Sequence, residues 1–238
     1  AAIKNPSYLA ISPNKKYVYS VTELGQPNGG GLVAFAFDIA NGTLTPINMQ
    51  SSLGNSPCYV SVHQSGDYVT AGNYSSGNLV YYKVNEDGSL NEPLNIKHVG
   101  SSTIKGRQDA PHVHAAVFSP DSKYLLVPDL GIDKVMIYPI DGAGNIKADN
   151  AGFVKMAPGA GPRHIDFHPN GKWAYVIEEL SGNLTALSYS KGKLKLINTI
   201  DAHPPGFTGI RGSADVHVSP DGNYVYCSNR GQSNTIGI

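Results

Sequence analysis

Four side chains able to bind an anion or move a proton stand at matching places along a repeated phrase of the sequence. His114 and Arg163 each precede a recurring Ser or His by five residues, and Glu179 and Arg230 each follow one by eleven. Arginine binds a phosphate or carboxylate through two parallel hydrogen bonds and can also stabilise an oxyanion. Imidazole, which titrates near ~6.5, can act as a general base towards water, and a carboxylate can orient the water, share the base role or pair with an arginine.

The repeated phrase predicts the fold that must position these residues. It occurs five times, with spacings of 51, 56, 49 and 51 residues between its anchors. The anchors are Ser12, His63, Ser119, His168 and Ser219. In the fourth copy, turn residues separate four short strands expected at about 164–168, 173–178, 183–189 and 194–200. No segment keeps a helical apolar stripe without a Gly or Pro. Four strands about every 50 residues are typical of a propeller blade.

We therefore expect an all-β protein, a β-propeller of four-stranded blades, with about five blades represented. The expected blade copies cover about 1–50, 51–105, 106–157, 158–208 and an incomplete 209–238. Because propellers avoid exposed sheet edges by closing, we expect residues 1–238 to form a single propeller domain that is part of a longer chain.

Blade geometry predicts where the candidate residues meet. Strands of a blade run alternately down and up, so the start of strand one and the end of strand two lie at one face near the channel. Positions that serve packing alone should hold similar residues in every copy, whereas these positions hold differing charged and polar residues. The expected substrate-binding residues at this face are Arg163, Arg230, His164, Asp215, His112 and Asn73. The Ser-Pro-Asp-Gly turns at the opposite face are alike and are expected to be structural.

Several features keep other interpretations open. Arg163 and Arg230 could instead form a rim of ion pairs with Glu179 and Asp215. His112 and His114 alternate onto one side of an extended segment and could begin a metal site, but this signal is weak and we expect no metal or cofactor. Glu178 and Glu179 are adjacent, so an extended strand directs only one to the channel, and we choose Glu179.

The polar connection from Ser101 to Asp109 is the longest in the chain and accounts for the 56-residue spacing. Lys105 and Arg107 in this connection could hang over the channel, although a solvated loop is the simpler interpretation.

Composition excludes several classes of protein. Eighteen basic and eighteen acidic residues among 238 give no net charge, which disfavours a nucleic-acid partner. No apolar run approaches the ~18 residues of a membrane span, so we expect no membrane partner. Cys58 and Cys227 form neither a disulfide framework nor a metal knuckle. This favours the cytoplasm, with the periplasm open if a leader was removed. We expect a monomer or weak homo-oligomer.

Several motifs together resemble a known family. Pro111-His-Val-His-Ala-Ala, Gly159-Ala-Gly-Pro-Arg-His, Glu179-Leu and Ser228-Asn-Arg-Gly resemble the lactonase family of seven-bladed propellers. That family includes cycloisomerase-type 6-phosphogluconolactonases and fungal 3-carboxymuconate lactonizing enzymes. The resemblance implies a metal-independent hydrolase of a small anionic sugar lactone, with a role in the pentose phosphate pathway.

The resemblance also places the family's site on His114, Arg163, Glu179 and Arg230. The implied reaction is hydrolysis of 6-phosphogluconolactone to 6-phosphogluconate by a base-activated water, with arginine binding the phosphate or the oxyanion. The alternatives are a carboxymuconate-type cycloisomerase and a non-catalytic propeller that acts as a binding module.

Overall fold

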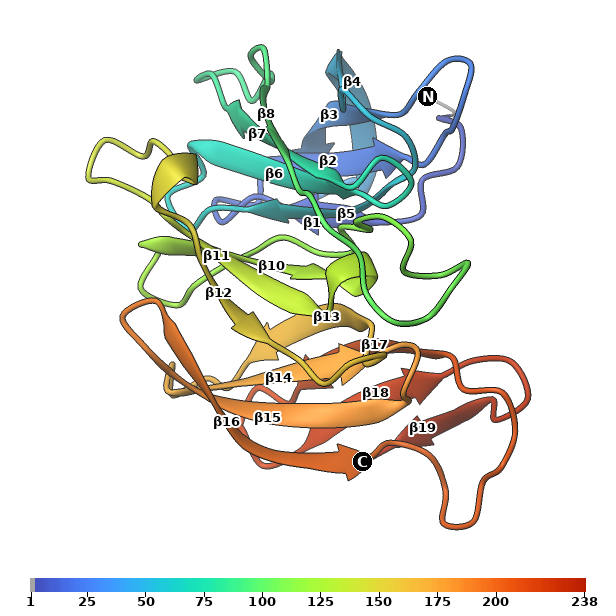
Figure 1. Cartoon of the computed structure of the whole chain (residues 1–238). Helices are drawn as coiled ribbons and strands as arrows, with labels where there is room; N and C mark the ends of the chain where they lie inside the picture. Colours follow the sequence, from blue (N-terminus) through green and yellow to red (C-terminus); the bar gives the residue numbers. More distant parts are fainter. Residues whose placement is uncertain (1–2) are drawn as a thin grey trace. The chain divides into compact units, whose positions relative to one another are not determined.

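The strands of the chain form five antiparallel sheets, as the repeat predicts. The computed structural model describes residues 3–238. Within that range the helical elements are two 3₁₀ turns, η1 (Leu130–Ile132) and η2 (Ala148–Asn150). The prediction of an all-β propeller built from four-stranded blades is confirmed, and Figure 1 shows the blades as successive twisted sheets. That residues 1–238 form one domain stays a prediction.

The first of two compact units comprises Ala1–Val99 and Pro111–Phe118. Its first sheet has the order β1 (Leu9–Ile11), β2 (Tyr17–Thr22), β3 (Gly31–Asp38), β4 (Thr43–Ser51). Its second sheet has the order β5 (Pro57–Val62), β6 (Tyr68–Asn73), β7 (Asn78–Lys83), β8 (Leu94–Lys97), and the short β9 (Val117–Phe118) also belongs to this unit. The two sheets share an apolar core that includes Tyr19, Leu32, Val60 and Tyr82, all almost fully buried.

The second unit comprises Gly100–Ala110 and Ser119–Ile238. It contains β10 (Tyr124–Asp129), β11 (Lys134–Pro139) and β12 (Gly152–Lys155), then a sheet of β13 (Pro162–Phe167), β14 (Trp173–Glu178), β15 (Asn183–Ser190) and β16 (Lys193–Asp201). The last sheet has the order β17 (Ser213–Val218), β18 (Val225–Asn229), β19 (Thr235–Gly237). The four strands predicted for the fourth copy match β13–β16, and the second matches to the residue.

The anchors of the repeat are turn residues, as predicted. The Oγ atoms of Ser119 and Ser219 donate to Asp121 and Asp221 and accept the backbone N–H five residues on. His168 performs a similar task, because its Nδ1 accepts the N–H of Asn170. Such local side-chain bonds satisfy the backbone of a tight turn and explain why the motif is alike in every copy.

A repeated backbone bond closes the opposite end of four sheets. The N–H donors belong to Glu23, Tyr74, Glu179 and Arg230, and each bonds a carbonyl 18 residues earlier, at Asn5, Ser56, Gly161 and Gly212 respectively. The residue after the second strand of each of these sheets is thereby fixed beside the segment that leads into the first strand, as the offsets within the repeat predict. In the third copy the corresponding residue is Leu130, which is buried in η1.

Candidate active site

A β-bulge directs Arg163 and His164 into the same cluster. The pairing of β13 with β14 shifts register between Pro162 and His164, so Arg163 is the extra residue. A regular strand would turn these two neighbours to opposite faces, whereas a bulge re-aims a side chain. Arg163 Nη1 accordingly lies 3.0 Å from His164 Nε2.

Two other first strands, β5 and β17, carry a similar bulge, whereas β1 pairs with β2 without a shift. The pairing of β5 with β6 shifts register around Cys58, and that of β17 with β18 shifts between Ser213 and Val216.

Glu179 is the centre of the cluster and lies against three arginines. Arg163 Nε donates to its Oε2 at 3.0 Å, and Arg230 Nη2 donates to the same atom at 2.7 Å. Arg107 Nη2 donates to Oε1 at 2.5 Å. The side chains of Glu179 and Arg163 are only 10% and 13% exposed, whereas those of Arg107 and Arg230 are 45% and 51% exposed. The buried carboxylate therefore holds one guanidinium that is largely buried, that of Arg163, and two that are about half exposed, those of Arg107 and Arg230.

Glu179 keeps its charge. Burial alone would raise the pKa of its carboxyl, but the charge of Arg230, the hydrogen bond from Arg107 and the charge of Arg163 hold the pKa below its usual value. A carboxylate so strongly held is a poor proton acceptor near neutral pH. Of the roles left open by the sequence, the structure shows the pairing with arginine.

Arg107 is a neighbour of the cluster that the sequence analysis considered only as a residue that could hang over the channel. Its side chain is exposed, as a solvated loop would have it, and it also reaches Glu179, 72 residues further along the chain. The sequence signal for this loop is the long spacing of 56 residues between the second and third copies, which shows that the connection carrying Arg107 is longer than the others.

His164 joins Arg163 to the next sheet. Arginine is always a donor, so Arg163 leaves Nε2 of His164 as an acceptor, and His164 donates from Nδ1 to Asp215 Oδ1 at 2.7 Å. Burial is the main cause that lowers the pKa of His164 to about 4, so the ring is neutral at pH 7. Burial would raise the pKa of Asp215, but the hydrogen bond from His164 together with the other charges and hydrogen bonds around the carboxylate holds the pKa below its usual value. The two residues thus orient the guanidinium of Arg163, which also donates to the carbonyl of Ala214.

Glu178 lies within its own sheet. Its carboxylate accepts from Ser181 Oγ and Thr185 Oγ1, both at 2.6 Å. The side chains of Glu178 and Glu179 thus have different hydrogen-bond partners, as expected for adjacent residues at the end of an extended strand.

The other predicted site residues lie in the first unit. His114 is buried, with Nδ1 3.5 Å from Cys58 Sγ and its ring edge-on to Tyr74. His112 stacks on Tyr74 and donates from Nδ1 to the carbonyl of that residue at 2.8 Å. Asn73 is fully buried and donates to the carbonyl of Ser52. Their placement relative to the arginines stays a prediction.

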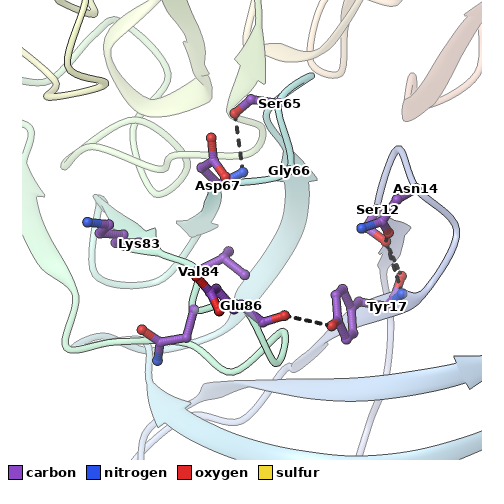
Figure 2. A pocket seen from close by; sticks show the side chains of 10 residues that line it. Ser12, Asn14, Tyr17, Ser65, Gly66, Asp67, Lys83, Val84 and Glu86 are labelled. Carbon is purple, nitrogen blue, oxygen red and sulfur yellow. Dashed lines mark hydrogen bonds between the residues drawn. The ribbon is translucent and has the colours of Figure 1, made fainter.

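A cavity of about 530 Å³ in the first unit lies at the turn end of β2 and β6 (Figure 2). Tyr17, Ser65, Asp67 and Glu86 line it, and the hydroxyl of Tyr17 bonds the carbonyl of Glu86. Tyr17 begins β2, whereas the candidate residues follow the ends of second strands, so the cavity belongs to the structural end of its sheets. Among residues 3–238, no three His, Cys, Asp or Glu side chains gather as metal ligands, and no helix is long and apolar enough to cross a membrane.

The sheets define a β-propeller that carries three arginines around one buried carboxylate. Over residues 1–238 the chain matches the family described as "Lactonase, 7-bladed beta-propeller" and belongs to it. It is 38% identical to a 6-phosphogluconolactonase of Formosa agariphila and 41% identical to one of Bacillus subtilis, covering 97% of this chain in both cases. The chain spans 66% and 65% of the lengths of these two relatives, respectively.

A solved structure described as a periplasmic gluconolactonase of Pseudomonas aeruginosa shares 36% identity and a TM-score of 0.93. It covers 99% of this chain, and the match extends over 68% of that structure's chain. The resemblance seen in the sequence is thereby confirmed.

Proposed function

We propose that this protein hydrolyses a sugar lactone, and that the substrate is 6-phosphogluconolactone. The observation that carries the proposal is the buried carboxylate of Glu179, which holds Arg163 and Arg230 at one place. Aligned guanidinium groups suit a phosphate or the oxyanion of a tetrahedral intermediate. Two relatives named 6-phosphogluconolactonase support the same substrate.

In the proposed reaction a water molecule attacks the lactone carbonyl while His114 accepts its proton. Arg163, the more buried and more fully bonded arginine, stabilises the negative charge that develops on the carbonyl oxygen. The C–O bond of the ring then breaks, the ring oxygen takes a proton and the product is the open-chain carboxylic acid. Arg230 binds the phosphate. Glu179 orients both guanidiniums, and base assistance by His114 contributes about 10²–10⁴-fold.

A carboxymuconate-type cycloisomerase is the second candidate. The observation that favours it is the pair of arginines held by Glu179, because guanidiniums bind substrate carboxylates as well as a phosphate. A non-catalytic binding module is the remaining alternative.

The test is a substrate panel with the intact protein. Decay of 6-phosphogluconolactone, of glucono-1,5-lactone and of a carboxymuconolactone is measured against spontaneous decay, with and without a chelator. We expect acceleration of the phosphorylated lactone that a chelator does not change and that His114→Gln reduces. Turnover of the muconolactone alone would favour the cycloisomerase, and no turnover of any lactone would favour the binding module.

We infer a cytoplasmic location from the pathway that this substrate implies. One structural relative is described as periplasmic, so cell fractionation with an antibody to the protein is the deciding measurement.

A further inference from the structure

Arg107 is the charged member of the cluster that the proposed reaction leaves without a role. It reaches Glu179 from the connection between Ser101 and Asp109. Its contact is with Oε1 of the carboxylate, whereas Arg163 and Arg230 both contact Oε2. Arg107 therefore occupies a separate side of the carboxylate.

The loop that carries Arg107 is held in place by a buried carboxylate. Asp133 is 4% exposed, and its Oδ2 accepts the hydroxyl of Ser102 at 2.5 Å while its Oδ1 accepts Nε2 of Gln108 at 2.7 Å. The same two oxygens accept the backbone N–H groups of Gly159 and Gly161 at 2.7 and 2.8 Å. Asp133 thus joins the loop of Arg107 to the segment that leads into Arg163.

Gln108 completes the attachment next to Arg107. It is fully buried, its Oε1 accepts the N–H of Ile104, and its Nε2 also donates to the carbonyl of Leu130. A polar side chain buried in this way fixes the backbone beside it. Arg107 therefore projects from a fixed support, and its 45% exposed side chain faces both Glu179 and solvent.

The charges of the cluster indicate its ligand. Arg107, Arg163 and Arg230 carry three positive charges against the single negative charge of Glu179. Counting also the ionised Asp215, which is bonded to the neutral His164, the cluster has a net charge of about +1, whereas a phosphate monoester carries about −1.5 to −2 at pH 7. Without Arg107 the net charge would be about 0, so the charge of Arg107 is the one that favours binding of a phosphate group.

We propose that Arg107 is a specificity-determining residue, which makes this site prefer a phosphorylated sugar acid or lactone over the same molecule without the phosphate. This inference deepens the proposed function and rests on its site. Asp133 and Gln108 act as positioning residues for Arg107. In the ligand complex, Arg107 donates to the phosphate oxygens while Arg163 keeps its contacts with Glu179 and His164.

Calorimetric binding of 6-phosphogluconate and of gluconate to the intact protein tests the proposal without requiring turnover. The variants are Arg107→Gln, Arg107→Lys and, as a matched control, Lys105→Gln, which removes a positive charge from an exposed residue of the same loop. We expect Arg107→Gln to weaken binding of 6-phosphogluconate by about 10- to 100-fold, the effect of one charge-assisted hydrogen bond. Gluconate affinity should change much less, Arg107→Lys should restore part of the preference, and Lys105→Gln should resemble the wild type.

Two results would overturn the inference. One is a wild type that does not distinguish the two sugar acids, and the other is an equal loss for both ligands in Arg107→Gln. Lactone hydrolysis by the same proteins separates the inference from the proposed function. If lactones are hydrolysed with an unchanged preference in Arg107→Gln, the inference fails and the function stands. If the wild type hydrolyses no lactone but binds 6-phosphogluconate through Arg107, the function fails and the inference stands.

Discussion

Nδ1 of His164 lies 2.7 Å from Oδ1 of Asp215, and this contact joins the first strands of two successive sheets of the second unit. Because His164 also accepts a hydrogen bond from Arg163, the orientation of the arginine depends on a neutral imidazole and an ionised carboxylate behind it. The candidate site is thus positioned by pairs that cross between blades.

The first prediction concerns the pH dependence of stability. Burial lowers the pKa of His164 to about 4 in the folded protein, against ~6.5 when unfolded. The unfolded state therefore binds more protons between those pH values, and the stabilisation present above pH 6.5 is lost as pH falls towards 4. We expect this residue to contribute a fall of about 3 kcal/mol in the free energy of unfolding.

Urea unfolding at pH 7, 5.5 and 4 measures this dependence, with His164→Gln as the comparison because it has no titrating ring. The variant should lose less stability over the same pH range. An identical loss in both proteins would contradict the assignment of His164 as a neutral buried ring.

The second prediction compares two adjacent carboxylates. Glu179→Gln removes the charge that holds the three arginines, so we expect kcat/KM for lactone hydrolysis to fall by about 10- to 100-fold through misplacement of the guanidiniums. Glu178→Gln, whose partners are Ser181 in the turn after β14 and Thr185 in β15, should lower the melting temperature without a comparable loss of turnover. Equal effects of the two variants on kcat/KM would show that Glu179 has no special relation to the site.

The third prediction concerns the loop support. Asp133→Asn keeps the size of the side chain but places an NH₂ group where the carboxylate accepts four hydrogen bonds. Leaving buried donors without acceptors costs about 1–3 kcal/mol each, so the loop should open. Limited proteolysis should then cleave within residues 101–109 well before the rest of the chain. Cleavage at the wild-type rate would show that Asp133 does not hold the loop.

The fourth prediction uses the glycine that precedes Arg163 by two residues. Gly161 has φ +63°, and an added Cβ would lie 2.5 Å from Cγ of Leu180. Gly161→Ala should therefore reduce the free energy of unfolding by about 1–3 kcal/mol. Gly142→Ala is the control, because open space surrounds that position and its φ is not in the left-handed region. Chemical denaturation of both variants decides the point, and equal stability would rule out strain at Gly161.

The repeat predicted much of this structure because blade spacing and turn chemistry are local in sequence. The strand at 173–178, the turn role of His168 and the equivalent positions of Glu179 and Arg230 all follow from one phrase and its offsets. The bulge at Arg163 was missed, because a single extra residue in one strand alters no residue type in the pattern.

The contacts of Arg107 and Asp133 could not be predicted for a different reason. The contact of Arg107 spans 72 residues of the chain and those of Asp133 span 25–31 residues, and no local pattern encodes such contacts. Asp133 resembles an ordinary loop aspartate in the sequence, and only its burial and its four donors distinguish it.

The most direct test of the account is kcat/KM for 6-phosphogluconolactone, measured with the intact wild type, Arg163→Lys and Arg163→Ala, after subtraction of spontaneous decay. The account predicts a clear enhancement by the wild type, a fall of about 10²–10³-fold in Arg163→Ala as for loss of an oxyanion donor, and partial activity in Arg163→Lys. Wild-type turnover in Arg163→Ala would contradict the claim that this cluster is the lactone site.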